Sequence, residues 1–565
     1  MVDGAAGGEA GAGRGGRWDE VAILAAHYQG RDSGKSLAEV AREHGVPDST
    51  LRHWVGRVDA SDGHPAWTRF FESPAGLQLL HMIVVAGILV ITLFCGGGVR
   101  AVCLFLQLSG LWRFVAAGYG TQCAAIQQME ERIGKFGELQ RERLAPKMPA
   151  KPITLTEDEN FHDGKPCLVA SEPSSDLLLI EEYADDRRAE TWTAKVQEAL
   201  KGLPVEVVQV TSDEARALVK HAKEDLGVHH SPDLFHPQQD ISRATSLTLG
   251  RNVADAEKDL AASENGRDKV KQEAQAYGES QRAPGRPPNY PARIRQAEEQ
   301  VAQAQADLDE ARQRQETVRK EARGLSQSYH PFDLVTAEIR DAATVEKDLN
   351  GHFDVIEEAA TEAGISDKCW GLLKKARRLV PKMVATITFV HTKIHETVNA
   401  LEDASEPVKA ALFGYLIPLL YLQEVARKAA TADARDAVLQ SCEGLKERSA
   451  QAIAVLDALG PDKRARFEHV ARLCAQFFQR SSSNVEGRNG FLALLHHSLH
   501  HLCPRKLRAL TVIHNYMIRR RSDGLTPAQR FFEQSHDDLF QYLLMTMPPP
   551  KRPAARRAVV PHPVH

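Results

Sequence analysis

The sequence predicts a largely helical protein built around one small mixed α/β sheet, and three observations lead to this expectation. The 565 residues are 43% hydrophobic and 26% charged, which is the balance of an ordinary folded protein of about three or four structural units. Aromatic residues make up only 6%, so the core must depend on alanine, leucine and valine, which favours helices. Strand-like alternation is confined to about residues 153–235, and helical spacing dominates elsewhere.

A helix-turn-helix is predicted for residues 17–60, behind a Gly/Ala-rich flexible tail at residues 1–16. Apolar residues recur at helical spacing before and after Gly45, and Pro47 is placed to begin the second helix. Three side chains of that helix are expected to face outward toward base edges or phosphates: Ser49, Arg52 and His53. The alternative is a helical hairpin that only packs on its neighbour.

Two apolar runs lie in the predicted helical region, residues 61–150. The first, residues 77–95, has a continuous apolar part from residue 82 onward, which is shorter than the roughly 20 residues that a helix needs to cross a membrane. Three glycines separate it from the second run, residues 99–117, which contains two arginines and a glutamine. We therefore expect a buried helical hairpin and no membrane association, with a membrane anchor as the alternative.

Residues 151–240 are predicted to form the sheet. Five short stretches have strand character, and helical stretches at 188–200 and 214–226 separate the last three of them. The five stretches are residues 153–159, 166–171, 177–183, 205–210 and 227–235. Three strands joined by tight turns, followed by two helix-to-strand crossovers, are the order of a ribonuclease-H-like mixed sheet.

The next residues, 241–480, predict a large all-helical insertion into this fold. Within it, residues 294–325 repeat apolar positions among Ala, Gln, Glu and Arg, which indicates a long coiled-coil-like helix. Residues 481–545 are expected to return to the sheet domain and to carry a further acidic residue. Residues 546–565 form a Pro/Arg-rich tail that is predicted to be disordered.

Three acidic residues lie where a ribonuclease-H-like sheet can bring them together. Asp158 lies near the end of the first strand, Asp213 ends the fourth, and Glu486 lies at a turn-to-helix junction after the insertion. Carboxylate clusters of this kind hold two Mg²⁺ ions, which activate a nucleophile and stabilise a departing oxygen. Asp213 has an alternative role as the cap of the following helix. Three acids compete with Asp158 for the first position: Glu157, Glu159 and Glu172.

The sequence around these acids resembles bacterial insertion-sequence transposases of the DDE type over about residues 150–535. The segments that carry the resemblance are residues 158–161 (DENF), 210–213 (VTSD), 233–236 (DLFH) and 484–489 (NVEGRN). The resemblance implies that Asp158, Asp213 and Glu486 are catalytic and bind two Mg²⁺ ions, which Mn²⁺ can replace. It also implies an accessory role for Asp233 and His236.

The resemblance further implies an enzyme that binds the terminal inverted repeats of an insertion sequence, cuts there, and joins the 3′ ends to target DNA. Handling two ends implies a homodimer or larger assembly on double-stranded DNA. Arg488 is the best placed of the downstream basic residues to contact a DNA phosphate. Residues 505–521 are also strongly basic and are expected to neutralise phosphates.

Charge and cysteine content limit the kind of partner and the compartment. The chain has 71 Lys and Arg against 75 Asp and Glu, a net charge of −4, which excludes a uniformly basic coat but permits a local basic site. Eight widely spaced cysteines without a CxxC pair favour the cytoplasm, with nucleoid association when DNA is bound. An alternative of another class is a DNA-binding structural or regulatory protein with an inactive ribonuclease-H-like domain.

Overall fold

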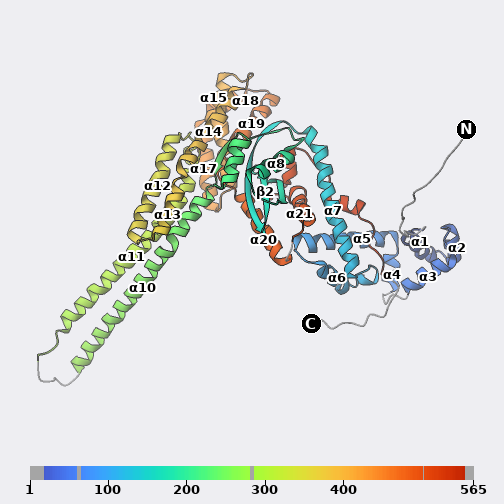
Figure 1. Ribbon diagram of the computed structural model, residues 1–565, viewed down its shortest axis with the longest axis horizontal. Helices are drawn as coiled ribbons and strands as arrows, with labels where there is room; N and C mark the ends of the chain where they lie inside the picture. The colour runs from blue at the N-terminus through green and yellow to red at the C-terminus, as the bar shows by residue number, and fades with distance from the viewer. Residues whose placement is uncertain (1–17, 60–64, 280–285, 500–501, 554–565) are drawn as a thin grey trace. The chain divides into compact units, whose positions relative to one another are not determined.

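The computed structural model describes residues 18–59, 65–279, 286–499 and 502–553 (Figure 1). The chain divides into two compact units, which are described separately below. The first unit comprises residues 1–148, 181–183 and 490–565, and the second comprises residues 149–180 and 184–489. The predicted tail at residues 1–16 and the end of the other tail, residues 554–565, lie outside the described residues.

The first unit begins with the predicted helix-turn-helix, which is confirmed. Its three helices are α1 (Glu20–Asp32), α2 (Leu37–Glu43) and α3 (Asp48–Asp59). Gly45 occupies the left-handed region between α2 and α3 with φ +61°, a conformation that glycine adopts without steric cost. Ser36 and Glu39 cap the start of α2 reciprocally. A small apolar core joins the three helices: Ile23, Leu24, Tyr28, Val40, Ala41, Val46, Leu51 and Val55.

The remaining helices of the first unit come from both ends of the chain. They are α4 (Pro65–Phe71), α5 (Pro74–Leu89), η1 (Val90–Phe94), α6 (Val99–Leu108), η2 (Leu111–Arg113), α7 (Tyr119–Leu144), η3 (Ala145–Lys147), α21 (Pro504–Tyr516), α22 (Pro527–Phe532) and α23 (Leu539–Thr546). Helices α21 and α23 both pack on α7. The division between units at residue 490 therefore differs from the expected return of residues 481–545 to the sheet domain, because α21–α23 bury their apolar faces in the first unit.

Helices α5 and η1 form one continuous apolar helix, Pro74–Phe94. Its 21 residues exceed the continuous apolar part that begins at residue 82, because the helix also includes the polar residue His81. The Nε2 atom of His81 lies 3.1 Å from the carbonyl oxygen of Leu544, within hydrogen-bond distance. This helix and Glu406–Arg427 have the length and composition to cross a membrane, with 39% and 56% of their most apolar windows buried. Core helices meet the same criterion, so the finding is weak evidence of a span. The expected burial of the first run is only partial, because Met82 and Val90 are exposed.

The second unit contains a five-stranded mixed sheet with the order β3-β2-β1-β4-β5. Strand β1 pairs antiparallel with β2 and parallel with β4, which pairs parallel with β5. The elements are β1 (Lys151–His162), β2 (Lys165–Glu172), β3 (Leu177–Tyr183), α8 (Ala189–Leu200), β4 (Val205–Ser212), α9 (Arg216–Lys220), η4 (His221–Asp225) and β5 (His229–Pro232). The predicted mixed sheet and its sequence of strands and helices are thus observed.

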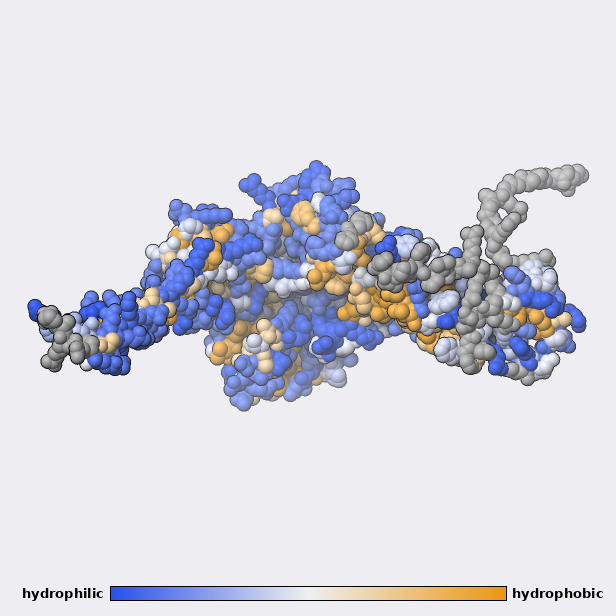
Figure 2. Space-filling view, turned by 90° about the horizontal axis from the view of Figure 1, so that it is seen from below, coloured by the Kyte–Doolittle hydropathy of each residue, from blue (hydrophilic) through white to orange (hydrophobic). Residues whose placement is uncertain are grey.

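Two long helices, α10 (Phe235–Glu279) and α11 (Tyr290–Ser328), leave the sheet as a paired arm (Figure 1). Helix α10 begins six residues before the predicted domain boundary at 241, because the carboxylate of Asp233 caps its first backbone N–H. On α11 a buried residue recurs every seventh position, as in a coiled coil: Ala297, Ala304, Ala311, Val318 and Leu325. Figure 2 shows a mainly hydrophilic surface along this arm.

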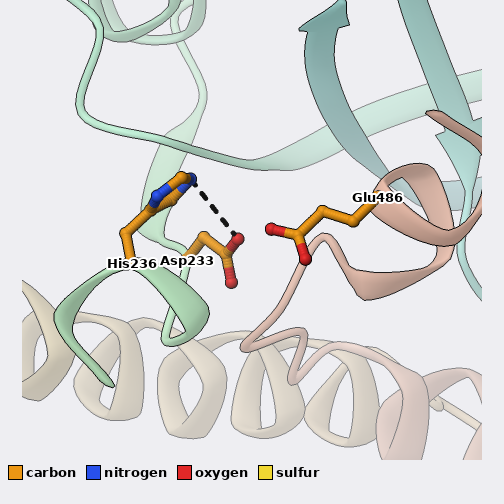
Figure 3. Close-up of side chains that lie close together, drawn as sticks. All are labelled: Asp233, His236 and Glu486. Atoms are coloured by element: carbon orange, nitrogen blue, oxygen red, sulfur yellow. Dashed lines mark ion pairs between the residues drawn. The ribbon is translucent and has the colours of Figure 1, made fainter. Parts of the chain in front are cut away.

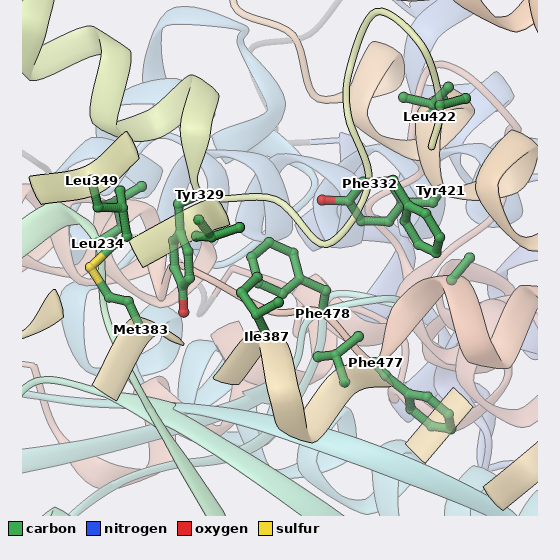
Figure 4. Packing of buried hydrophobic residues seen from close by; sticks show 14 of the residues in the cluster. Leu234, Tyr329, Phe332, Leu349, Met383, Ile387, Tyr421, Leu422, Phe477 and Phe478 are labelled. Atoms are coloured by element: carbon green, nitrogen blue, oxygen red, sulfur yellow. The ribbon is translucent and has the colours of Figure 1, made fainter. Parts of the chain in front are cut away.

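The rest of the insertion is a compact helical body. Its helices are α12 (Ala342–Ala363), α13 (Asp367–Arg377), α14 (Val380–Asn399), α15 (Glu406–Ala411), η5 (Leu412–Leu416), α16 (Ile417–Arg427), α17 (Ala432–Arg448), α18 (Ala450–Asp457) and α19 (Pro461–Gln476). Their apolar faces form one large core, in which Tyr329, Phe332, Tyr421 and Phe478 meet (Figure 4). Leu234, directly after the sheet, belongs to the same core and therefore ties the insertion to the strand ends.

Candidate metal centre

The strand ends of the second unit carry a group of side chains that can hold a metal ion. Asp233, His236 and Glu486 each offer one ligand atom, and the three atoms lie within 4.8 Å of one another. Figure 3 shows the three side chains pointing toward one another, with Asp233 and His236 at the start of α10 and Glu486 on the opposite side. Two carboxylates and an imidazole suit a divalent cation of the Mg²⁺, Mn²⁺ or Zn²⁺ type.

Asp233 is the most rigidly held member of this group. It follows β5 and is only 1% exposed. Its backbone N–H donates to the carbonyl of Ser212 at the end of β4, at 3.0 Å. One carboxylate oxygen accepts the Ser482 hydroxyl at 2.6 Å, and the other accepts the N–H of Phe235 at 3.0 Å. The sequence resemblance gave Asp233 an accessory place, whereas the structure puts it at the centre of the ligand group.

Asp158 lies on β1 beside the same group. Its carboxylate accepts the side-chain N–H of Asn489 at 2.8 Å and the backbone N–H of Glu159 at 2.9 Å. Burial raises the pKa of Asp158 to about 6, and the negative charge of Asp213 adds to the rise. The two hydrogen bonds and the imidazole of His236 act in the opposite direction. The carboxyl is therefore held in a site that disfavours its charge unless a cation is present.

The alternation of β1 separates Asp158 from its nearest competitor. Thr156 and Asp158 contact Asn484 and Asn489 of α20 (Ser483–Leu499), so the even positions face that helix. Glu157 points to the other face of the sheet.

Each of the three acids that competed with Asp158 for the first catalytic position has a partner elsewhere. Glu157 lies 3.3 Å from the imidazole of His221, and both side chains are fully buried. Glu159 forms an ion pair with Arg187. Glu172 accepts the backbone N–H groups of Ser174 and Ser175 in the following turn. Asp158 is thus the acid of this set that faces Asn489 and the metal-competent group.

Asp213 has two roles in the structure. It follows β4 directly, and one carboxylate oxygen accepts the N–H of Ala215 at 2.9 Å, which is the helix-start cap considered as the alternative. Its charge also raises the pKa of Asp158, so the two carboxylates lie within electrostatic reach across the neighbouring strands β1 and β4. Capping uses one oxygen and leaves the other available to a cation.

Glu486 lies in the first turn of α20, where its backbone N–H donates to the carbonyl of Ser482. Burial raises the pKa of Glu486 to about 7, and the charges of Asp233 and Asp158 raise it further. Asp158 and Asp213 are not members of the group within 4.8 Å, but Asp158 lies within electrostatic reach of Asp213 and Glu486, although the whole insertion separates Asp158 from Glu486 in the sequence. A cation placed among them would relieve their mutual repulsion.

The segment that precedes α20 forms a strap across the strand ends. The carbonyl of Gln479 accepts the side chains of Gln209 and Thr211 on β4, and the carbonyl of Arg480 accepts the N–H of Leu234. Further along, Asn484 donates to Ser171 on β2 at 2.6 Å. These contacts were not predicted from the sequence. The two asparagines of the Asn-x-Glu-Gly-x-Asn segment were the signal for them, because they flank Glu486 and hold its helix on the sheet.

The residues expected to contact DNA lie in different environments. Ser49, Arg52 and His53 are exposed on α3, and Arg52 pairs with Asp48 of the same helix at 2.7 Å. Arg488, the residue judged best placed to contact a DNA phosphate, is only 9% exposed, and that contact stays a prediction.

The basic stretch that begins at residue 505 is also engaged within the first unit. Arg505 lies 2.8 Å from Glu130 of α7, Lys506 lies 3.5 Å from the same carboxylate, and Arg508 pairs with Glu138. These ion pairs hold α21 on α7. Acids of α7 therefore balance part of the charge of this stretch, and its contact with DNA phosphates stays a prediction.

Two family models match parts of the chain. Residues 13–78, which include the helix-turn-helix, match the model HTH_Tnp_1, described as "Transposase". Residues 412–559, which include Glu486, match a family of unknown function (DUF6399). No curated protein matches the chain. These matches support a transposase, and the chain carries an N-terminal DNA-binding domain of the transposase type.

Proposed function

We propose that this protein is a DNA transposase of the DDE type, with a ribonuclease-H-like catalytic domain into which the helical insertion is placed. The observation that carries the proposal is the metal-competent group of Asp233, His236 and Glu486 at the strand ends, with Asp158 in electrostatic reach of both Glu486 and Asp213. The strand order β3-β2-β1-β4-β5 supports it, because this order makes the strands that carry the first two acids neighbours. The transposase-type helix-turn-helix supplies the DNA-binding part.

The donor set fits a pair of divalent cations such as Mg²⁺, with Mn²⁺ as a substitute. Asp158, Asp213 and Glu486 would hold them, and Asp233, which lies in one group with Glu486, would be a fourth carboxylate. The fit rests on hard oxygen donors and on pKa values raised to about 6 for Asp158 and about 7 for Glu486 by burial and like charge. When bound, the cations would lower the cost of ionising the attacking water or 3′-hydroxyl and of releasing the opposite oxygen.

The protein's own residues position this chemistry. Asn489 holds the Asp158 carboxylate from one side, and Ser482 holds that of Asp233 from the other. His236 lies 3.9 Å from Asp233, where its imidazole can orient the carboxylate or exchange a proton with solvent. Cleavage and strand transfer need such positioning more than they need a covalent intermediate.

The proposed substrates are the terminal inverted repeats of an insertion sequence and a target duplex. Exposed Ser49, Arg52 and His53 on α3 would meet the repeat, as the second helix of a helix-turn-helix does in a major groove. Joining two ends requires a homodimer or larger assembly on DNA. The proposed location is the cytoplasm, at the nucleoid when DNA is bound.

The experiment is metal-dependent nicking of terminal-repeat DNA by the full-length protein, with the repeats taken from the sequence that flanks the gene. Wild type is expected to nick with Mg²⁺ or Mn²⁺ and not with EDTA. Asp213→Ala is expected to abolish nicking while Glu206→Ala, an exposed acid on the same strand, retains it. Unchanged nicking by Asp213→Ala would refute the proposal. The regulatory alternative gains support if wild type binds the repeats but nicks none of them with either metal.

A further inference from the structure

An aromatic side chain lies exposed inside the metal-competent group. Phe235 is placed between the two residues of that group that come from the start of α10, and its ring is 41% exposed. The preceding residue, Leu234, is 4% exposed and belongs to the core of the insertion. The chain therefore buries one apolar residue at this point and leaves the next, larger one in contact with solvent.

The orientation of Phe235 is fixed by its neighbours. Its backbone N–H donates to the Asp233 carboxylate at 3.0 Å, which sets the start of the helix. Its ring stands edge-on to the imidazole of His236, with ring centroids 5.8 Å apart and an angle of 74° between the planes. The two rings thus form a small aromatic corner directly beside the carboxylates.

An exposed phenylalanine among charged groups lacks the stabilisation that burial would give it. A ligand that presents a flat apolar face restores that stabilisation. Nucleobases are such ligands, and stacking on an aromatic side chain is independent of base identity because every base has a π-face. A phosphate held at the carboxylates through a divalent cation would bring its base close to this ring, because the ring contacts His236, which lies 3.9 Å from Asp233.

We infer that Phe235 is a stacking surface for an unpaired nucleobase next to the phosphate that reacts. A paired base in a duplex has both faces covered by its neighbours, so the ring can only meet a base that is flipped out or lies at a single-stranded end. The inference rests on the proposed function and specifies its substrate further: the DNA at the site is unpaired at one position. Phe235 then acts in binding and positioning, while the carboxylates perform the chemistry.

The test measures binding without cleavage, in Ca²⁺, a hard cation that carboxylate oxygens hold, with a fluorescein-labelled single strand dT12 and a blunt duplex of the same length as probes. Phe235→Ala is expected to weaken dT12 binding by about 5- to 150-fold and Phe235→Trp to retain it. Leu247→Ala is the matched control, because Leu247 is a 64% exposed apolar residue on the same helix. Duplex binding, which depends on the helix-turn-helix, is expected to be equal in all variants.

Three results would overturn the inference: no binding of dT12 by wild type, equal binding of dT12 by Phe235→Ala and wild type, or a parallel loss of single-strand and duplex binding in Phe235→Ala. Thermal melting of each variant distinguishes a loss of stacking from a loss of folding. Because no cleavage is required, the result is independent of whether Asp213→Ala abolishes nicking. A protein that fails to nick yet shows the Phe235 dependence would keep the nucleobase site and lose the transposase proposal.

Discussion

The helix-turn-helix and the metal centre differ in how far along the chain their parts come from. The helix-turn-helix is assembled within residues 18–59, and its core residues lie on three consecutive short helices. The candidate metal centre combines Asp233 and His236 with Glu486, which lies beyond a large helical insertion, and Asp158 on β1 is electrostatically coupled to Glu486. The first is a local structure that can form early, whereas the second exists only when sheet, insertion and strap have all assembled.

This difference predicts that DNA binding and DNA cleavage can be separated by mutation. Changes in the helix-turn-helix should lower affinity for specific DNA and leave metal binding intact. Changes at the strand ends should do the opposite. The second region depends on more distant packing than the helix-turn-helix does. Its core residue Leu234 connects the sheet to the insertion immediately beside Asp233.

The largest effect is expected for Glu486→Gln, which keeps the size of the side chain and removes its charge. We expect nicking of repeat DNA to fall by about 10²- to 10³-fold, because one of the carboxylates that would hold the cations is lost, and with it the stabilisation of the charge that develops in the transition state. Duplex affinity, measured by fluorescence anisotropy, should stay within twofold of wild type. A variant that lost both activities together would show that the two regions are not separable.

The sequence predicted the helix-turn-helix in nearly full detail, but it predicted the candidate metal centre only in part. Helical spacing around Gly45 was sufficient for α2 and α3, because the contacts that define them lie a few residues apart. For the metal centre, the pattern pointed to three acids but ranked Asp233 as accessory. Its central place depends on the hydrogen bond from Ser482, which is 249 residues away and has no signal in local periodicity.

Other departures from expectation have the same cause. Arg488 was the basic residue judged best placed to contact a DNA phosphate, yet only 9% of it is exposed. The basic residues from 505 onward looked free for DNA, yet acids of α7, more than 360 residues earlier, pair with them. Charge patterns along a sequence do not reveal which charges tertiary contacts will neutralise.

The next largest effect tests how the metal centre is supported. Asn489→Ala removes the side-chain N–H that holds the Asp158 carboxylate, while leaving all four acids in place. Loss of such a supporting hydrogen bond lowers metal affinity by about 10- to 100-fold. Isothermal titration with Mn²⁺ measures it, with Asn350→Ala, a half-buried residue of α12, as control. An Mn²⁺ affinity equal to that of wild type would mean that Asn489 is dispensable for the site.

The pH dependence of the metal centre should be of intermediate size. The pKa of Asp158 is raised to about 6 and that of Glu486 to about 7, so a cation must displace protons from both below these values. Apparent Mn²⁺ affinity should therefore rise with pH, by about tenfold per pH unit for each proton released, and level off above about pH 7. Glu486→Gln should remove the upper part of the rise.

The raised pKa values of Asp158 and Glu486 also affect the stability of the folded protein, which should fall as pH rises, whereas Mn²⁺ affinity should increase. An acid whose pKa is higher in the folded protein than in the unfolded chain favours folding while it is protonated. The metal-free protein should therefore lose stability between about pH 4 and pH 7. The melting temperature of wild type, compared with that of Glu486→Gln at each pH, isolates this contribution from other groups. A difference between the two proteins that grows toward acid pH would contradict the assignment.

A smaller effect is expected from the exposed face of α3. Arg52→Ala should weaken binding to repeat DNA by about fivefold, the low end of the range for a specific contact, because Arg52 already pairs with Asp48 at 2.7 Å. Metal affinity should be unchanged, in contrast to Asn489→Ala. Arg31→Ala, a basic residue at the end of α1, is the control for a general loss of positive charge. Equal losses in Arg31→Ala and Arg52→Ala would indicate that α3 has no special place in recognition.

The smallest effect concerns the stability of the helix-turn-helix alone. Ser36 accepts the N–H of Glu39 at 3.3 Å, while the Glu39 carboxylate accepts the N–H of Ser36 at 2.7 Å, so the two cap α2 from both sides. Ser36→Ala should cost about 1 kcal/mol of local stability. Because residues 18–59 have their own core, amide hydrogen exchange should accelerate in α2 and α3 but not in β1 or α20. Faster amide hydrogen exchange in β1 as well would show that the two regions unfold together. Independent folding could then not be the reason that DNA binding and cleavage are separable.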